Sequence, residues 1–393
     1  MQQGAGKIVF LFFQLMIILA CTKLAGELSI RCGQPSVLGK LVSGIVIGPA
    51  VLGWIQNTEI ISQLSTVGVL LLMFIAGLET DLDMLNKNRN ASLAVATGGV
   101  LLPMAAGWLG GQLIGMSMAQ SLFMGLLFSA TSVSISVQTL KELEKLNTRE
   151  SAAILGAAIV DDILVVVLLA VLMSFLHAGE VSIAMILGKK AVFFIGIWLL
   201  GREVVPAFMQ RFAAIRVSEA VLSAALIVCF FFAYLAESLG VAGIIGSFAA
   251  GIAIGRTKYK NDVERRVSPV AYAVFVPVFF VSIGLVISFT GVWQQLWLIA
   301  ALTIAAVLAK LIGAAAGARL TGFHCHSSLC IGAGMISRGE VALILATIGL
   351  ESQLLEPDYF TAVIIVVILT TLIAPPLLKQ LFSGLQPSSR GMK

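Results

Sequence analysis

Apolar runs about as long as a bilayer is thick follow one another along almost the whole chain. An α-helix needs about 20 apolar residues to cross the hydrocarbon core of a membrane. Thirteen such runs are predicted, at residues 7–26, 34–54, 59–78, 91–116, 119–138, 150–176, 185–204, 215–237, 239–256, 267–288, 293–317, 327–350 and 358–384. Only 11% of the 393 residues are charged, against about 25% in a soluble domain. We therefore expect an all-α polytopic membrane protein with 13 transmembrane helices.

The composition and motifs also exclude several classes of function. The net charge of +5 comes from basic residues in short loops and at span ends, so it does not indicate nucleic-acid binding. No Walker or Rossmann glycine motif occurs, which gives no support to ATP coupling. His324-Cys325-His326 with Cys330 lacks the spacing of a structural zinc site. We expect no enzymatic activity, no cofactor and no transition-metal site.

The distribution of Lys and Arg predicts the orientation in the membrane. Thirteen spans place the two ends of the chain on opposite sides. Loops and span ends on one side hold nineteen basic residues, and those on the other side hold three, namely Lys7, Lys189 and Lys190. Cytoplasmic loops carry the excess of Lys and Arg. We therefore expect the N-terminus outside and the C-terminus in the cytoplasm.

The two halves of the chain repeat each other at a constant offset of 207 residues. The matched residues include Gly39 and Gly246, Gly44 and Gly251, Gly48 and Gly255, Gly77-Leu78 and Gly284-Leu285, and Gly110 and Gly317. Seven spans separate equivalent positions, so the repeats, at about 7–176 and 215–384, are predicted to be inverted within a single transmembrane domain. The span at 185–204 links them. Inverted repeats are typical of secondary transporters, whose substrate sites lie near the midplane.

Two spans at corresponding positions of the repeats are interrupted by small and polar residues. The span at 119–138 contains Phe128–Ser134, and the span at 327–350 contains Gly332–Glu340. Paired interruptions of this kind indicate broken helices at a transport site. Within the second one, Arg338 and Glu340 are interpreted as stabilising the break in preference to binding the ion.

Asp161 and Asp162 lie inside the apolar run from Ala152 to Phe175, which contains no other charge. Each central charge costs roughly 3 kcal/mol to insert, so such residues need partners, water or ions. Adjacent helical residues point about 100° apart, so one aspartate should face the ion path and the other a neighbouring helix. Lys310, in the middle of the span at 293–317, needs a carboxylate, and either aspartate fits. A permanent structural ion pair and a proton-exchanging pair would make the same contact.

Several motifs together resemble a known family of transporters. They are Gly39–Gly53, Phe74–Glu79, Val160-Asp161-Asp162, Phe279–Leu285, Lys310 and Ser337-Arg338-Gly339-Glu340. In this order the set resembles the monovalent cation:proton antiporter 2 family, and within it the short bacterial Na+/H+ antiporters of the NapA and GerN type. The resemblance covers essentially the whole chain.

The resemblance implies an NhaA-like fold, with two crossed discontinuous helices in a core domain that moves like an elevator, and a homodimer in the bacterial cell membrane. It implies that Asp162 is the main carrier of cation or protons and that Asp161 pairs with Lys310. Two acids in place of Asn-Asp suggest electrogenic exchange. The chain ends soon after its last span, so the C-terminal nucleotide-binding domain of related potassium efflux systems is not expected.

These observations predict a secondary antiporter that exchanges Na+, or K+ or Li+, for H+. Cation and protons are predicted to compete for Asp162, assisted by Asp161, Thr131 and Ser132. The alternatives are a K+/H+ efflux antiporter, a passive cation channel, an ion-sensing receptor subunit and a sodium-coupled solute symporter.

Overall fold

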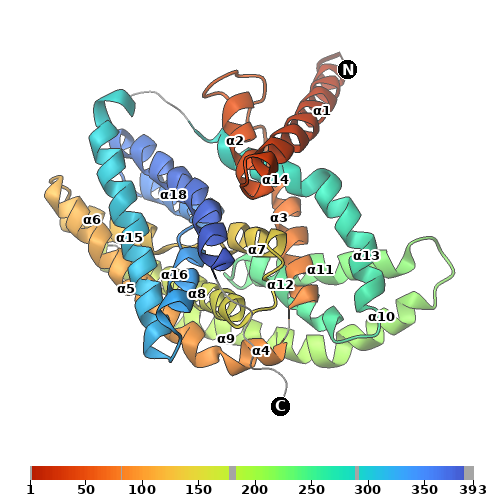
Figure 1. Cartoon of the computed structure of the whole chain (residues 1–393). Helices are drawn as coiled ribbons and strands as arrows, with labels where there is room; N and C mark the ends of the chain where they lie inside the picture. Colours follow the sequence, from red (N-terminus) through yellow and green to blue (C-terminus); the bar gives the residue numbers. More distant parts are fainter. Residues whose placement is uncertain (1, 81, 177–182, 288–291, 385–393) are drawn as a thin grey trace. The chain divides into compact units, whose positions relative to one another are not determined.

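The computed structural model describes residues 2–80, 82–176, 183–287 and 292–384, and every regular element among them is helical (Figure 1). Ten helical runs in these ranges are long and apolar enough to cross a membrane. Three shorter apolar helices, Ser36–Ile47, Gly243–Gly255 and Val341–Leu350, fall in the predicted spans at 34–54, 239–256 and 327–350. The expectation of an all-α polytopic membrane protein is therefore confirmed.

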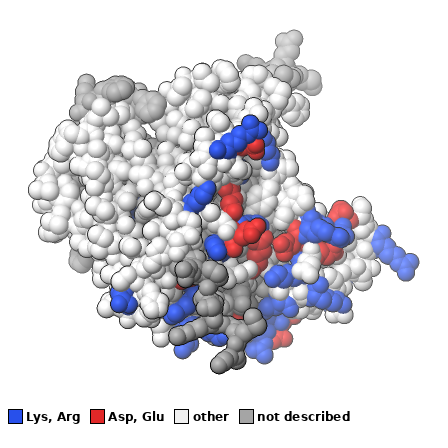
Figure 2. All heavy atoms as spheres, in the orientation of Figure 1, with Lys and Arg blue, Asp and Glu red and all other residues white. Residues whose placement is uncertain are grey.

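The surface of the protein is suited to lipid. Figure 2 shows that Lys, Arg, Asp and Glu are absent from much of the face in view. Large apolar side chains are exposed on the helices, with Leu113 and Leu320 each 86% exposed. Exposed apolar surface on this scale is unfavourable in water but matches the hydrocarbon core of a bilayer.

The chain divides into two compact units. The first comprises residues 1–29, 39–82 and 166–289. Its helices are α1 (Gln2–Arg31), α2 (Ser36–Ile47), α3 (Glu59–Glu79), α9 (Ile183–Leu199), α10 (Val205–Ala213), α11 (Ala220–Ser238), α12 (Gly243–Gly255), α13 (Lys260–Val270) and α14 (Val276–Leu285), with π-helical turns at Leu200–Val204 and Ala271–Phe275. Within this unit α3 packs against α12 and α14.

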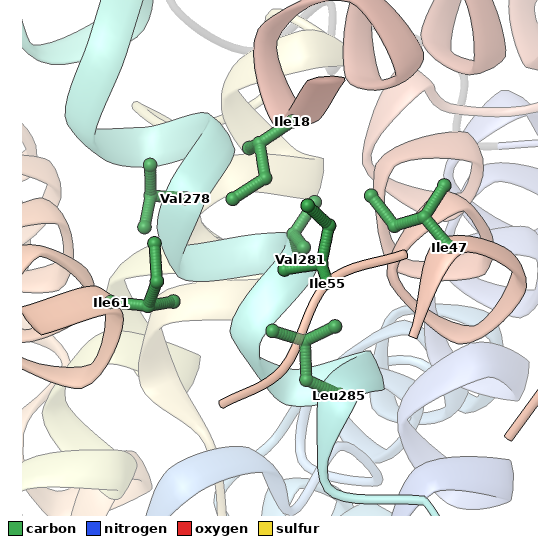
Figure 3. Close-up of a cluster of buried hydrophobic side chains, with 7 residues drawn as sticks. All are labelled: Ile18, Ile47, Ile55, Ile61, Val278, Val281 and Leu285. Carbon is green, nitrogen blue, oxygen red and sulfur yellow. The ribbon is translucent and has the colours of Figure 1, made fainter. Parts of the chain in front are cut away.

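A cluster of buried aliphatic side chains forms one core of the first unit (Figure 3). Its members are Ile18, Ile47, Ile55, Ile61, Val278, Val281 and Leu285. A glycine allows α2 to approach α14 in this region, because a Cβ at Gly44 would lie 2.4 Å from the Val281 carbonyl oxygen. Gly44, one of the repeated glycines, therefore serves close helix packing.

The second unit comprises residues 30–38, 83–165 and 290–393. Its helices are α4 (Leu82–Lys87), α5 (Arg89–Leu113), α6 (Met118–Ser129), α7 (Val133–Glu142), the first part of α8 (Arg149–Leu176), α15 (Leu296–Leu320), α16 (Cys325–Gly334), α17 (Gly339–Glu351) and α18 (Pro357–Ser383), with a 3₁₀ turn at Val292–Gln295. Figure 1 shows α5 between α6 and α15, and both neighbours pack against it.

Helix boundaries repeat at the same offset as the sequence. Adding 207 to the bounds of α5 gives the bounds of α15, and adding it to those of α2 and α8 gives α12 and α18 to within one residue. The α6–α7 pair corresponds in the same way to α16–α17. The repeated glycines thus belong to repeated helices.

Helices α5 and α15 cross at a close backbone contact that depends on glycine. A Cβ at Gly98 would lie 2.2 Å from the Gly313 carbonyl oxygen, whereas at Gly110 the nearest atom is a leucine methyl 3.3 Å away. Gly98→Ala should therefore push the helices apart and lower the melting temperature of the detergent-purified protein. Gly110→Ala should be neutral or slightly stabilising, because Ala favours a helix by about 1 kcal/mol over Gly. Equal melting temperatures of the two variants would contradict this packing.

Candidate functional site

The two interrupted spans meet at their interruptions. Helix α6 ends at Ser129 and α7 begins at Val133, and α16 ends at Gly334 while α17 begins at Gly339. The Ser132 N–H donates to the Ser337 carbonyl at 2.6 Å, and the Ser337 hydroxyl donates to the Ser132 carbonyl at 2.9 Å. Backbone groups released by one break thus find partners in the other. The interruptions predicted at 128–134 and 332–340 are confirmed.

A glycine is needed where α17 begins. Gly339 has a φ of +48°, in the left-handed region that favours glycine. A Cβ at this position would also lie 2.4 Å from the Ser132 hydroxyl oxygen. The Gly339 N–H donates to the Thr371 hydroxyl of α18 at 3.3 Å. The second interruption is therefore fixed both by the first one and by a neighbouring helix.

Both aspartates of α8 are buried in the second unit, and they differ in their surroundings. Asp161 is 0% exposed, and its Oδ1 lies 3.2 Å from Lys310 Nζ. Asp162 is 7% exposed and lies within electrostatic range of the same ammonium group. The structure therefore places Asp161 directly against the lysine, and the adjacent residue points elsewhere, as helical geometry requires.

Lys310 is held by more than its ion pair. Its ammonium donates to the Gly99 carbonyl of α5 at 2.8 Å and to the carbonyl of Ser129, the last residue of α6. Both Asp161 oxygens lie within 3.4 Å of it. The aspartate was foreseeable from the sequence, whereas the two carbonyls were not, because backbone acceptors carry no residue-type signal. The available signal was Pro103, four residues after Gly99.

Arg338 lies in the second interruption, between α16 and α17, and is 0% exposed. Its Nη2 donates to the Phe128 carbonyl at 2.8 Å and to the Ala306 carbonyl of α15 at 3.0 Å, and its Nη1 donates to the Ile336 carbonyl at 3.1 Å. The guanidinium also lies over the Phe128 ring, 5.5 Å from its centroid. Two buried cations thus meet the C-terminal end of α6, where the helix dipole favours positive charge.

The remaining predicted site residues are Thr131, Ser132 and Glu340. Thr131 and Ser132 are buried within the first interruption. The Thr131 hydroxyl is near enough to Asp161 to interact with its carboxyl group, without the geometry of a hydrogen bond. Glu340 is the second residue of α17, and its side chain lies outside the described part of the chain. Every other predicted site residue belongs to the second unit and is buried there.

Nearly the whole chain around this constellation matches a known protein family. The family model "Sodium/hydrogen exchanger, transmembrane" matches residues 16–384. The chain belongs to the sodium/hydrogen exchanger family. This membership confirms the family resemblance drawn from the motifs.

Similar proteins include members from several organisms. The chain is 61% identical over 382 residues to the Na+/H+-K+ antiporter GerN of Bacillus cereus, covering 97% of this chain and 99% of the relative. It is 43% identical to an Na+/H+ antiporter of Enterococcus hirae, covering 93% and 96%. Its fold is similar to that of the sodium proton antiporter MjNhaP1 of Methanocaldococcus jannaschii, with a TM-score of 0.63 at 15% identity over 96% and 97% of the chains.

Proposed function

We propose that this sodium/hydrogen exchanger family member is a secondary active antiporter that exchanges Na+ for H+ across the bacterial cell membrane. The observation that carries the proposal is the buried Asp161-Asp162 pair beside Lys310, in the unit that contains both interrupted helices. Buried ionisable residues in membrane helices mark ion pathways and proton relays. The names of the relatives from Bacillus cereus and Enterococcus hirae both include Na+ and H+, which supports the same reaction.

The mechanism rests on competition for one carboxylate. Asp162 is the carrier, assisted by Asp161, Thr131 and Ser132, and it binds either the cation or protons. The carboxylate neutralised by proton or cation is cheaper to move through a low-dielectric region than the bare one. Only the occupied site therefore moves between the two sides, and the two fluxes are coupled without any further linkage. With Asp161 and Lys310 both ionisable, we propose that the exchange is electrogenic.

The same proposal extends to the architecture. We propose thirteen membrane crossings in two inverted repeats with an NhaA-like arrangement, the second unit being the core that carries the ion. Helix bounds that recur at the offset of 207 support the repeats. The distribution of nineteen basic residues against three supports an N-terminus outside and a C-terminus in the cytoplasm. Assembly as a homodimer follows from the family resemblance.

A K+/H+ antiporter is the second candidate. It is favoured by one observation, that the name of the 61% identical relative from Bacillus cereus includes K+ beside Na+. The frame of interrupted helices and buried acids is common to both candidates. Ion selectivity depends on the size and field strength of the coordinating groups.

Proton flux in liposomes tests the proposal. The purified protein is reconstituted with a trapped pH dye, a clamped membrane potential and an imposed pH gradient, and Na+, Li+, K+ and Rb+ are added in parallel titrations. Saturable proton movement against the added cation is expected, with Na+ effective at the lowest concentration. Cation flux without proton counter-movement would indicate a channel, and cation binding without flux a sensor. Proton movement driven equally well by K+ would favour the second candidate.

A further inference from the structure

Helix α5, whose Gly99 carbonyl binds Lys310, contains a proline. Pro103 lies four residues after Gly99 in α5, at the position whose N–H would donate to the Gly99 carbonyl in a regular α-helix. Proline has no N–H and removes this bond. The Gly99 carbonyl accepts from the Lys310 ammonium instead, at 2.8 Å. Pro103 is itself buried, and its side chain has no polar atom that could contact the lysine directly.

The second carbonyl that holds Lys310 is released by a different irregularity. Ser129 ends α6, so its carbonyl has no donor within that helix. Lys310 therefore binds two carbonyls that helices of the same unit have left unsatisfied, one through a proline and one through a break. Without the ammonium, these buried acceptors would each carry a desolvation cost. The proline and the helix break each free one carbonyl, and the lysine ammonium donates to both.

We infer that Pro103 is a positioning residue of the exchange site, because its missing N–H reserves the Gly99 carbonyl for the Lys310 ammonium. This inference rests on the proposed antiport. The two carbonyls are neutral and belong to the backbone, so they hold the ammonium in place whatever the charge of Asp161. Asp161 is then able to gain a proton or face a cation while the lysine keeps its position. A lysine held by the aspartate alone would lose its anchor at that moment.

The inference predicts a shift in the pH profile on replacing Pro103. Pro103→Ala supplies an N–H that competes for the Gly99 carbonyl. A lost acceptor disfavours the charged form of the lysine, so the lysine should release its proton at lower pH. The charged groups that act on this ammonium are Asp161 and Asp162 from α8 and Arg338 from the second interruption, and none of them is altered. We expect the activity profile to move toward acid by about half to one pH unit.

The experiment measures Na+-driven proton flux in liposomes from pH 6 to pH 9 for the wild type and each variant. Pro376→Ala is the matched control, because it makes the same chemical change inside α18, and the groups that bind the lysine in the described chain come from α5, α6 and α8. Pro103→Val, which also carries an N–H and keeps a branched apolar side chain at this buried position, replaces Pro103→Ala if that variant does not yield folded protein. Melting temperatures of all variants separate a change of the site from a general loss of stability.

The outcomes are distinct. An acid shift in Pro103→Ala with an unchanged profile in Pro376→Ala supports the positioning role. A wild-type profile in folded Pro103→Ala overturns it, as does an equal shift in both variants. Absence of Na+-driven proton flux in the wild type would overturn the proposed antiport itself, whatever the proline variants show.

Discussion

Replacing Asp162 by Asn is expected to abolish Na+-driven proton movement and to leave a folded protein in the membrane. Asparagine has nearly the shape of aspartate but neither takes up a proton nor offers a charge to a cation. Since both proposed substrates use this carboxylate, neither half of the exchange should remain. Removing a charge that is 7% exposed also lowers the cost of burial, so the melting temperature should not fall.

The measurement is dequenching of a pH dye in everted vesicles on addition of Na+. Glu144→Gln, the same carboxylate-to-amide change at an exposed loop residue, is the control and should retain normal flux. Asp161→Asn is the informative comparison, because Asp161 contacts Lys310 and the lysine keeps its two carbonyls. It should retain measurable exchange with altered electrogenicity. Normal dequenching in Asp162→Asn would remove Asp162 from the carrier role, and equal loss in both aspartate variants would contradict their division of roles.

The parts of the site that were predictable are those where burial is costly. Two carboxylates and a lysine in apolar runs require one another, and Asp161 and Lys310 do meet at 3.2 Å. Small and polar residues in the middle of an apolar run predict a break, and the breaks occur at 130–132 and 335–338. In each case the residue type itself carries the physical constraint, so sequence alone is sufficient.

The parts that were not predictable depend on backbone atoms. The three basic residues that fall within predicted spans, Lys23, Lys310 and Arg338, all donate to carbonyls at helix irregularities. For Lys23 the acceptor is the Tyr272 carbonyl at 3.3 Å. Tyr272 lies in a π-helical turn, where the N–H of the residue five positions later would donate to this carbonyl, but that residue is Pro277, which has no N–H. Which carbonyl a break or proline releases depends on the local helix geometry, and which cation reaches it depends on packing. A proline within a helix therefore predicts which backbone carbonyl lacks its usual donor, four residues earlier in an α-helix or five residues earlier in a π-helix. It does not predict which cation will donate to that carbonyl.

Replacing Arg338 by Met is expected to cause the largest loss of stability of any substitution considered for this protein. The guanidinium satisfies the carbonyls of Phe128, Ala306 and Ile336 inside the second unit, and methionine fills similar space with no donor. A buried acceptor left without a partner costs about 1–3 kcal/mol. The Ala306 carbonyl keeps the N–H of Lys310 within α15, so two acceptors, the carbonyls of Phe128 and Ile336, would lose their partner. The loss should therefore destabilise the protein by about 2 kcal/mol or more, although an inserted water molecule would reduce the effect.

Arg319→Met is the matched control, since Arg319 also donates to a carbonyl at a helix end, that of Phe323 at 2.9 Å, but is exposed. This single hydrogen bond is only partly buried, so the melting temperature of Arg319→Met should change little. Arg338→Lys keeps the charge near the α6 end, yet one ammonium cannot reproduce a guanidinium that donates through two nitrogens in a fixed fork. It should melt between the wild type and Arg338→Met. Because Arg338 also acts on Asp161 through its charge, Arg338→Lys should transport better than Arg338→Met at temperatures where both are folded. Equal melting temperatures for Arg338→Met and Arg319→Met would show that the break is held by the serine contacts alone.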